Sequence, residues 1–269
     1  MARTDTRKSS RPGRRDAPAD DGSYWERSRR PLEILVFLAP FIVVYELGLL
    51  AALRTREGVL TNQAHGALLR FFDLVGMRGE AVGLPALSLP AAALVAVLIS
   101  WQVISRRAWV VHLPTLPLMA VEAAAAALPL VVLGRLVAWI PALGTPPDQQ
   151  VRSLGLGGQL AVAVGAGLYE ELVFRMLAIA VVHALVRDLM RVPERWAVPI
   201  SIVVPAILFC LYHPLSGQGA PASARAIFFL GAGLWWGTVY VVRGFGIAVG
   251  SHAAYDAVAL LLPPGAFSG

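Results

Sequence analysis

The sequence predicts an all-α fold, a polytopic integral membrane bundle of about seven transmembrane helices. Of the 269 residues, 57% are hydrophobic and only 15% are charged, whereas soluble domains average roughly 25% charged residues. The apolar residues also form long runs without the alternation that barrel strands require. These observations exclude a soluble enzyme and a disordered protein. The single cysteine, Cys210, excludes a disulfide-stabilised secreted domain.

The predicted elements follow one another along the chain. Residues 1–30, rich in Arg, Asp, Ser and Pro, predict a basic disordered tail in the cytoplasm. Each of the next seven stretches is long enough to cross a bilayer as a helix: Leu32–Leu53, Leu84–Ile104, Leu116–Ile140, Gln159–Val186, Trp196–His213, Ala224–Val242 and Phe245–Leu262. They divide into an N-terminal region of helices and loops over 31–156 and a second helical region over 157–262, before a short tail over 263–269.

Two stretches carry local signals of their own. The fifth contains Pro199 and Pro205, which predict a kink or a break in that helix. The longest loop covers residues 54–83, and its cluster of Leu, Phe and Val side chains predicts a short helix on the membrane surface.

The placement of positive charge predicts the orientation of the bundle. Nine of the 23 Lys and Arg residues lie in residues 1–30. If this tail is cytoplasmic, the alternating loops place 15 of the 23 basic residues on the cytoplasmic side, 6 on the outer side and 2 within the helices, a bias that fits the positive-inside rule. The basic balance of +6 therefore indicates orientation and a lipid bilayer as partner, with no nucleic acid.

The fourth stretch holds three charges within six residues, although charged groups at membrane depth cost roughly 2.5–3.5 kcal/mol each on insertion scales. Glu171 and Arg175 are four residues apart and can pair on one helix face. Glu170 projects about 100° from Glu171 and needs a partner on another helix. Gly165 and Gly167 let a neighbouring helix approach closely.

Candidate partners for Glu170 lie on later stretches. His213 ends the fifth stretch, and His252 and Asp256 share one face of the seventh. A carboxylate with two histidines and an aspartate, brought from three helices, indicates a catalytic site or an ion pathway more than simple packing. Two other carboxylates, Glu46 and Glu122, are open to a packing or a catalytic role. Cys210 is interpreted as an inert packing residue.

These residues form three ordered motifs, which read Glu170-Glu171-x-x-x-Arg175, Phe209-x-x-x-His213 and His252-x-x-x-Asp256. They resemble the motifs of the CPBP (CAAX protease and bacteriocin-processing) intramembrane proteases, which include the type II CAAX prenyl endopeptidases. The resemblance covers roughly residues 157–262. It implies an integral membrane hydrolase, and for bacterial relatives a place in the inner membrane, acting on a membrane protein or peptide.

The resemblance also implies roles for the motif residues. Glu170 would activate water with help from His213, and His252 with Asp256 would stabilise the oxyanion or complete the polar site. Such a reaction needs a base beside the water and donors aimed at the developing charge. Glu171, Arg175 and Phe209 would form the supporting shell. Asp256 stands where the family often has Asn, and because an ionised Asp only accepts hydrogen bonds, it fits better as an orienter of His252 or a metal ligand.

No cofactor is required by these motifs, but zinc is an alternative. Four of the candidate residues could hold a zinc ion with an open position, namely Glu170, His213, His252 and Asp256. The HExxH spacing of helix-borne zinc proteases is absent from the sequence. The resemblance also implies a metal-free, glutamate-dependent endopeptidase as a possible mechanism, and this is the alternative that we favour. The competing functions are an inactive membrane scaffold or an immunity or regulatory protein, and an ion- or proton-coupled transporter.

Overall fold

The computed structural model describes residues 22–55, 58–77, 86–138, 151, 153–215 and 222–261. Within these residues the chain is built almost wholly from helices, so the predicted all-α fold class is confirmed. The greater part of the basic tail, up to residue 21, and the C-terminal tail over 263–269 lie outside the described residues.

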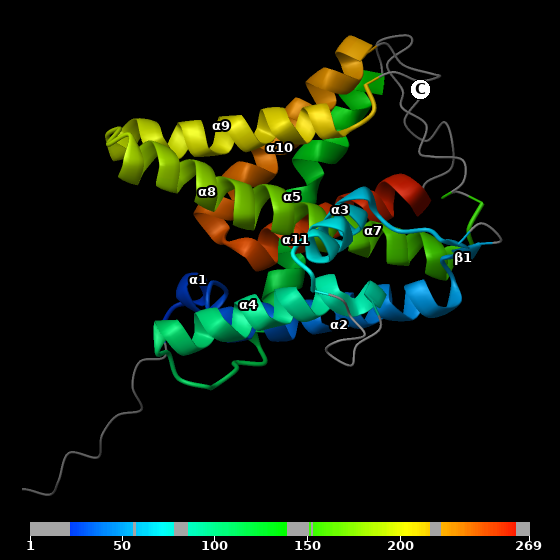
Figure 1. Ribbon diagram of the computed structural model, residues 1–269, viewed down its shortest axis with the longest axis horizontal. Helices are drawn as coiled ribbons and strands as arrows, with labels where there is room; N and C mark the ends of the chain where they lie inside the picture. The colour runs from blue at the N-terminus through cyan, green and yellow to red at the C-terminus, as the bar shows by residue number, and fades with distance from the viewer. Residues whose placement is uncertain are drawn as a thin grey trace, which may run out of the picture.

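Each predicted apolar stretch forms a helix (Figure 1). In chain order these are α2 (Pro31–Ala51), α4 (Leu89–Ser105), α5 (Thr115–Ala138), α7 (Leu156–Glu171), α9 (Glu194–Tyr212), α10 (Ala222–Arg243) and α11 (Phe245–Leu261). The helix that begins as α7 continues through the π-helical segment η3 (Leu172–Ala178), α8 (Ile179–His183) and the π-helical segment η4 (Ala184–Leu189). The short elements are α1 (Tyr24–Arg27), α3 (Gln63–Leu74), the 3-10 turn η2 (Ala86–Ser88), and the antiparallel strands β1 (Arg54–Thr55) and β2 (Gly58–Val59).

Four of the described helices, α2, α5, α9 and α10, are long and apolar enough to cross a membrane. Helix α4 is apolar but has only 17 residues, so the predicted count of seven spans, like the predicted orientation, stays a prediction. The outer surface carries large exposed apolar side chains, among them Leu47, Ile104 and Leu136. An extensive apolar surface suits contact with lipid better than contact with water.

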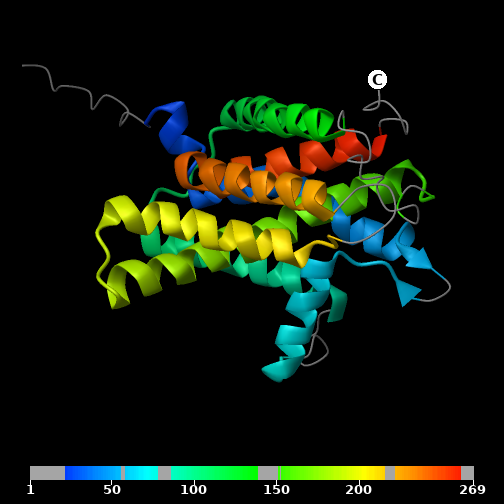
Figure 2. The same ribbon diagram turned by 90° about the horizontal axis from the view of Figure 1, so that it is seen from above.

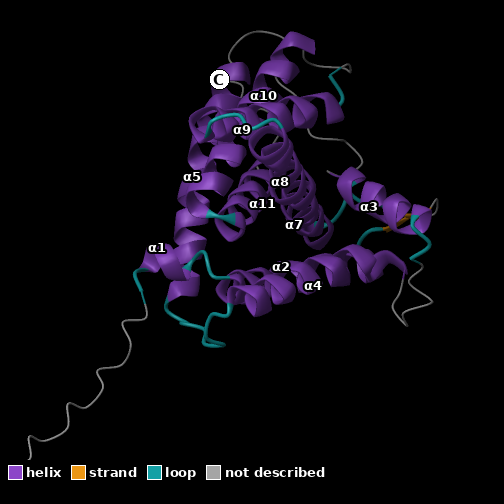
Figure 3. Ribbon diagram, turned by 60° about the vertical axis from the view of Figure 1, so that its left-hand side comes forward, coloured by secondary structure: helices purple, strands orange, loops and turns teal. Residues whose placement is uncertain are grey.

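The helices pack in layers around α11. Helices α2 and α4 lie side by side along one edge, α7 and α11 lie in the middle, and α8 with α9 forms the opposite edge (Figures 1 and 3). Helix α11 contacts both α7 and α5, and its first turns, with Phe245, Ile247 and Val249 fully buried, form part of the core.

Two glycines allow α7 to approach its neighbours closely, as the sequence indicates. A Cβ atom at Gly167 would lie 2.9 Å from the Val249 carbonyl oxygen and from the Ala253 nitrogen of α11. At Gly165 it would overlap the ring of Tyr45 on α2. Small residues at such crossings bring backbones together, and here they bring the end of α7 against α11.

Helix α9 contains Pro199 and Pro205 but runs unbroken to Tyr212, so the break that these prolines suggested does not occur. The helix ends because the next residue, His213, precedes Pro214 and adopts an extended conformation, with φ −84° and ψ 146°. His213 therefore leaves the helix axis just where α9 meets the centre of the bundle.

The segment just before α2 differs from the prediction. The composition predicts a disordered tail over all of residues 1–30. Residues 24–27 instead form α1, which contacts the bundle through polar groups. The Tyr24 hydroxyl donates to the carboxylate of Glu122 on α5, and Arg243, at the end of α10, donates to the same carboxylate and to Ser28 Oγ at 3.1 Å.

The aromatic side chains of α1 help to explain why this segment is ordered. The Arg243 guanidinium carbon lies 3.7 Å from the centre of the Trp25 ring, an arrangement in which the ring face attracts the cation. Arg243 is buried and Glu122 is partly buried, so their polar atoms need partners. Tyr24 of α1 and the adjacent Ser28 each provide one. Counting charges along the tail misses such a long-range contact.

The predicted helix in the longest loop is α3, which projects from the bundle at a steep angle (Figure 2). It is tied down by His65, a fully buried side chain. Because a carbonyl only accepts, His65 Nε2–H donates to the Leu87 oxygen at 2.9 Å, and Nδ1 accepts from the Tyr45 hydroxyl at 2.5 Å. Both bonds require a neutral ring, and burial lowers the pKa of His65 from 6.5 to about 4.

We expect acid to loosen α3. The folded-state pKa of His65 lies below its ordinary value, so its contribution to stability is complete above about pH 6.5 and is lost as the pH falls toward 4. Between pH 7 and pH 5 the loss is about 2 kcal/mol. Hydrogen exchange of the α3 amides, corrected for intrinsic rates, measures it. In His65→Gln this pH response should vanish, and an equal response in that variant would assign it to another group.

Candidate active site

Glu170 and Glu171 end α7, at the point where the helix passes into η3. Both are buried, with 5% and 0% of their surface exposed. Successive helical residues point about 100° apart, so the two carboxylates face different partners, as the sequence predicts. π-Helical segments are frequent at functional sites, and η3 begins directly after this pair.

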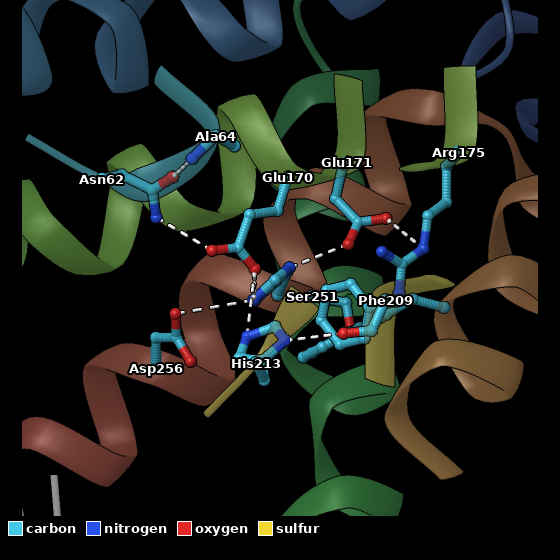
Figure 4. Close-up of polar contacts among 11 residues, drawn as sticks. Asn62, Ala64, Glu170, Glu171, Arg175, Phe209, His213, Ser251 and Asp256 are labelled. Atoms are coloured by element: carbon cyan, nitrogen blue, oxygen red, sulfur yellow. Dashed lines mark hydrogen bonds and ion pairs between the residues drawn. The ribbon is translucent and has the colours of Figure 1, made fainter. Parts of the chain in front are cut away.

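Glu170 lies at the centre of a polar cluster contributed by several segments (Figure 4). Its Oε1 accepts a 2.9 Å hydrogen bond from Asn62 Nδ2, in the segment before α3. Its Oε2 lies 3.7 Å from His213 Nε2 and 3.9 Å from His252 Nε2. The structure therefore brings together the carboxylate and the two histidines whose convergence the sequence analysis required.

His213 reaches this cluster because α9 ends at the residue before it. Its Nδ1–H donates to the Phe209 carbonyl oxygen at 2.8 Å, and its ring stacks on Phe229 with centroids 4.0 Å apart. With Nδ1 used in this way, Nε2 is the atom directed at Glu170. If α9 continued straight through residue 213, His213 and His252 would be held apart. Because α9 ends at Tyr212, the extended His213 can turn toward His252.

His252, on α11, is fixed on two sides. Its Nδ1–H donates to Glu171 Oε1 at 2.8 Å, and its ring stacks on Trp236 with centroids 3.8 Å apart. Trp236 is itself held by a hydrogen bond from Nε1 to Ser251 Oγ. The other ring nitrogen, Nε2, lies 3.5 Å from Asp256 Oδ2. The imidazole is thus held with Nε2 directed toward Glu170 and Asp256.

The pairing of Glu171 differs from the sequence interpretation in one respect. Glu171 and Arg175 form the expected pair, with Arg175 Nε 3.2 Å from Glu171 Oε2. However, Glu171 accepts from His252 Nδ1 and so orients His252, one of the two roles that the sequence suggested for Asp256. Arg175 is 1% exposed, and its guanidinium lies 4.3 Å from the Phe209 ring centre. Phe209 therefore supports the cluster through both its carbonyl and its ring.

A cavity of about 560 Å³ opens onto this cluster. Glu170, His213 and Asp256 face it from the polar side, and Asn62 lines it as well. The rest of the wall is largely aromatic and aliphatic, with Phe228, Phe229, Tyr212, Tyr255, Val162 and Leu260. Such a cavity offers an apolar surface to a substrate and a small set of convergent polar groups, the usual design of a binding site.

The four residues named as possible zinc ligands do not fit a metal. Among the described residues no group of three His, Cys, Asp or Glu side chains is arranged to hold a metal ion. Glu170 Oε1 is bonded to Asn62, and His252 Nδ1 is bonded to Glu171.

Three other candidates lie outside the cluster. Glu46 accepts from Ser88 Oγ at 2.6 Å, and Glu122 pairs with Arg243. Cys210 is a buried free thiol whose Sγ contacts the Ala226 carbonyl of α10. Their contacts are those of packing residues.

Two residues of the cluster, Asn62 and Trp236, were not predicted from the sequence. Asn62 carries a weak local signal, because Asn is a preferred N-cap and stands directly before the predicted short helix. Trp236 carries none, since an aromatic residue in an apolar helix is expected in any core. Both are identified only by the contacts that they make with residues far away in the chain.

Comparison with known proteins agrees with these motifs. A family model described as type II CAAX prenyl endopeptidase Rce1-like matches residues 153–258. This segment includes Glu170, Glu171, Arg175, Phe209, His213, His252 and Asp256, and for it the predicted membership of the CPBP proteases is confirmed. No curated protein and no solved structure matches the chain.

Proposed function

We propose that this chain, whose residues 153–258 carry the type II CAAX prenyl endopeptidase-like domain, is a glutamate-dependent intramembrane endopeptidase. It hydrolyses a peptide bond in a segment within or next to the membrane. The observation that carries the proposal is the convergence of Glu170 Oε2 with His213 Nε2, at 3.7 Å, and His252 Nε2, at 3.9 Å, beside a cavity.

In this proposal Glu170 and His213 hold the attacking water. An ionised Glu170 and a neutral His213 with its proton on Nδ1 both present acceptors, and their separation exceeds a direct hydrogen bond. A polar contact across such a distance suits a bridging water, which donates one O–H to each group and keeps its lone pairs free. As the water oxygen bonds to the carbonyl carbon, Glu170 takes one of its protons.

His252 is proposed to stabilise the oxyanion of the tetrahedral intermediate. As an imidazolium it donates from Nδ1 to Glu171 and from Nε2 to the developing negative charge. When the C–N bond breaks, the proton on Glu170 passes to the leaving nitrogen. The carboxylate is restored, and the products are a new carboxyl terminus and a new amino terminus.

The contacts that hold His252 in place support this proposal. A catalytic constellation works when its members are held by their own packing and hydrogen bonds. Trp236 fixes the plane of the imidazole, and Glu171 fixes its rotation. Arg175 holds Glu171 from the far side. Asp256, next to Nε2, balances the imidazolium charge.

The proposal is tested by hydrolysis in labelled water. Purified protein in lipid vesicles is mixed with membranes from cells that lack the chain, in H₂¹⁸O, and new peptide termini are identified by mass spectrometry. We expect a limited set of new carboxyl termini, each carrying one ¹⁸O atom, that Glu170→Gln does not produce. Absence of such termini contradicts the proposal in favour of a scaffold. Glu170-dependent ion flux without cleavage contradicts it in favour of a transporter.

We also predict that the activity does not depend on a bound metal, because Glu170 Oε1 and His252 Nδ1 are bonded to other side chains and no three described His, Cys, Asp or Glu residues are arranged to hold a metal ion. Cleavage should be unchanged, within about twofold, after exhaustive dialysis against EDTA. Elemental analysis should find far less than one zinc per chain. Loss of cleavage on chelation, with recovery on addition of zinc, would contradict the metal-free mechanism.

A further inference from the structure

Asn62 stands outside the matched segment 153–258, and yet its Nδ2 lies closer to the Glu170 carboxylate, at 2.9 Å, than either histidine nitrogen does. It lies after β2, as the N-cap of α3, with φ −61° and ψ 145°. Figure 4 shows its side chain extending from the α3 segment to the carboxylate at the end of α7. The N-terminal region therefore provides a polar group to the cluster on which the proposed function rests.

The two ends of the Asn62 amide have different partners, and chemistry assigns them. Oδ1 accepts from the Ala64 backbone N–H at 2.7 Å, which caps α3. Nδ2 donates to Glu170 Oε1 at 2.9 Å. A flipped amide would place an acceptor against the carboxylate and a donor against an N–H, so only this orientation satisfies both ends.

The segment that carries Asn62 is held firmly. Ala64 and His65 are buried at the start of α3, with 1% and 0% exposed. The His65 ring packs 4.9 Å from that of Tyr169, the residue before Glu170, and its two hydrogen bonds reach Tyr45 and Leu87. The position of Asn62 relative to α7 is thus set by contacts that do not involve Glu170 itself.

We propose that Asn62 is a positioning residue for Glu170. By engaging Oε1, it fixes the rotation of the carboxylate and leaves Oε2 as the oxygen directed at His213 and His252. This inference rests on the proposed function and extends it to a residue of the N-terminal region.

Three substitutions separate this role from helix capping. Asn62→Ser keeps an N-cap oxygen but is too short to reach Glu170, and Asn62→Asp keeps the cap but replaces the donor by a second carboxylate. Asn62→Ala removes both contacts. Because Asn, Asp and Ser cap about equally well and Ala caps poorly, hydrogen exchange of α3 should be unchanged for Ser and Asp, and altered for Ala.

Cleavage rates should follow a different order. A hydrogen bond to a charged group corresponds to roughly a 10- to 100-fold effect, so we expect kcat of Asn62→Ser to fall by about that factor, with KM within about twofold. Asn62→Asp should be slower still, because like charges repel. Leu74→Ala, at the exposed far end of α3, is the matched control and should keep the wild-type kcat.

Two results would overturn the inference: a wild-type kcat in Asn62→Ser and Asn62→Asp, or a loss of kcat confined to Asn62→Ala, since either indicates capping alone. Glu170→Gln is measured in the same series. If it cleaves like the wild type, the proposed function fails. If it is inactive while Asn62→Ser is fully active, only the role of Asn62 fails.

Discussion

Glu170→Gln is expected to fold normally and to lose cleavage by about 10²- to 10⁴-fold, the range that general base catalysis contributes. Gln has nearly the same size, and its amide oxygen can still accept from Asn62 Nδ2. It has no carboxylate, however, and cannot take a proton from water. Initial rates on a peptide identified by ¹⁸O labelling, with Tm measured in the same detergent, give both quantities.

Glu46→Gln is the matched control for this variant. Glu46 is another carboxylate in a helix of the bundle, and its Oε2 accepts from Ser88 Oγ at 2.6 Å, outside the polar cluster. The same change of charge there should leave kcat within about twofold of wild type, because no reacting group is involved. Equal losses in both variants would show that the effect of Glu170→Gln is not specific to the site.

Arg175→Met is expected to reduce both stability and activity. The side chains of Arg175 and Glu171 are at most 2% exposed, and Arg175 Nε lies 3.2 Å from Glu171 Oε2. Removal of one partner leaves the other charge buried, which typically costs about 3–5 kcal/mol. Glu171 then also loses the group that holds its Oε2, so the orientation of His252 weakens. Chemical unfolding in detergent measures the first effect, and cleavage by the folded fraction measures the second.

The double variant Glu171→Gln/Arg175→Met separates the two effects. Because no buried charge is left without a partner, it should recover most of the lost stability. Its activity should stay low, since a neutral amide offsets the His252 imidazolium less well than a carboxylate does. If Arg175→Met alone unfolds within about 0.5 kcal/mol of the wild type, the pair does not support the site in the way described.

Much of the helical architecture is predictable from the sequence. Spanning helices must satisfy their own backbone groups in lipid, so apolar runs predict helices without knowledge of neighbours, and all seven coincide with helices. The Glu171–Arg175 pair is predictable for a similar reason, because four residues on a helix bring two side chains to one face. The motifs that match the family model are also readable in order along the chain.

The remaining features depend on contacts between segments far apart in the sequence. Helix α1 is ordered because it contacts the Glu122–Arg243 pair, which joins α5 to α10. The choice of Glu171 over Asp256 as the group that holds His252 Nδ1 depends on the angle between α7 and α11. The spacing of residues along one helix does not predict that angle. It depends on the close approach of the two helices at Gly167.

The helical class can therefore be read from the sequence, as can the family match of residues 153–258 and the charged residues within the apolar helices. Which of those groups meet, and that Asn62 from the N-terminal region joins them, is visible only in the folded chain. The difference comes from the range of the interactions. Backbone hydrogen bonding and burial act on each segment alone, whereas the direction of a side chain at a shared site is set by the packing of every helix around it.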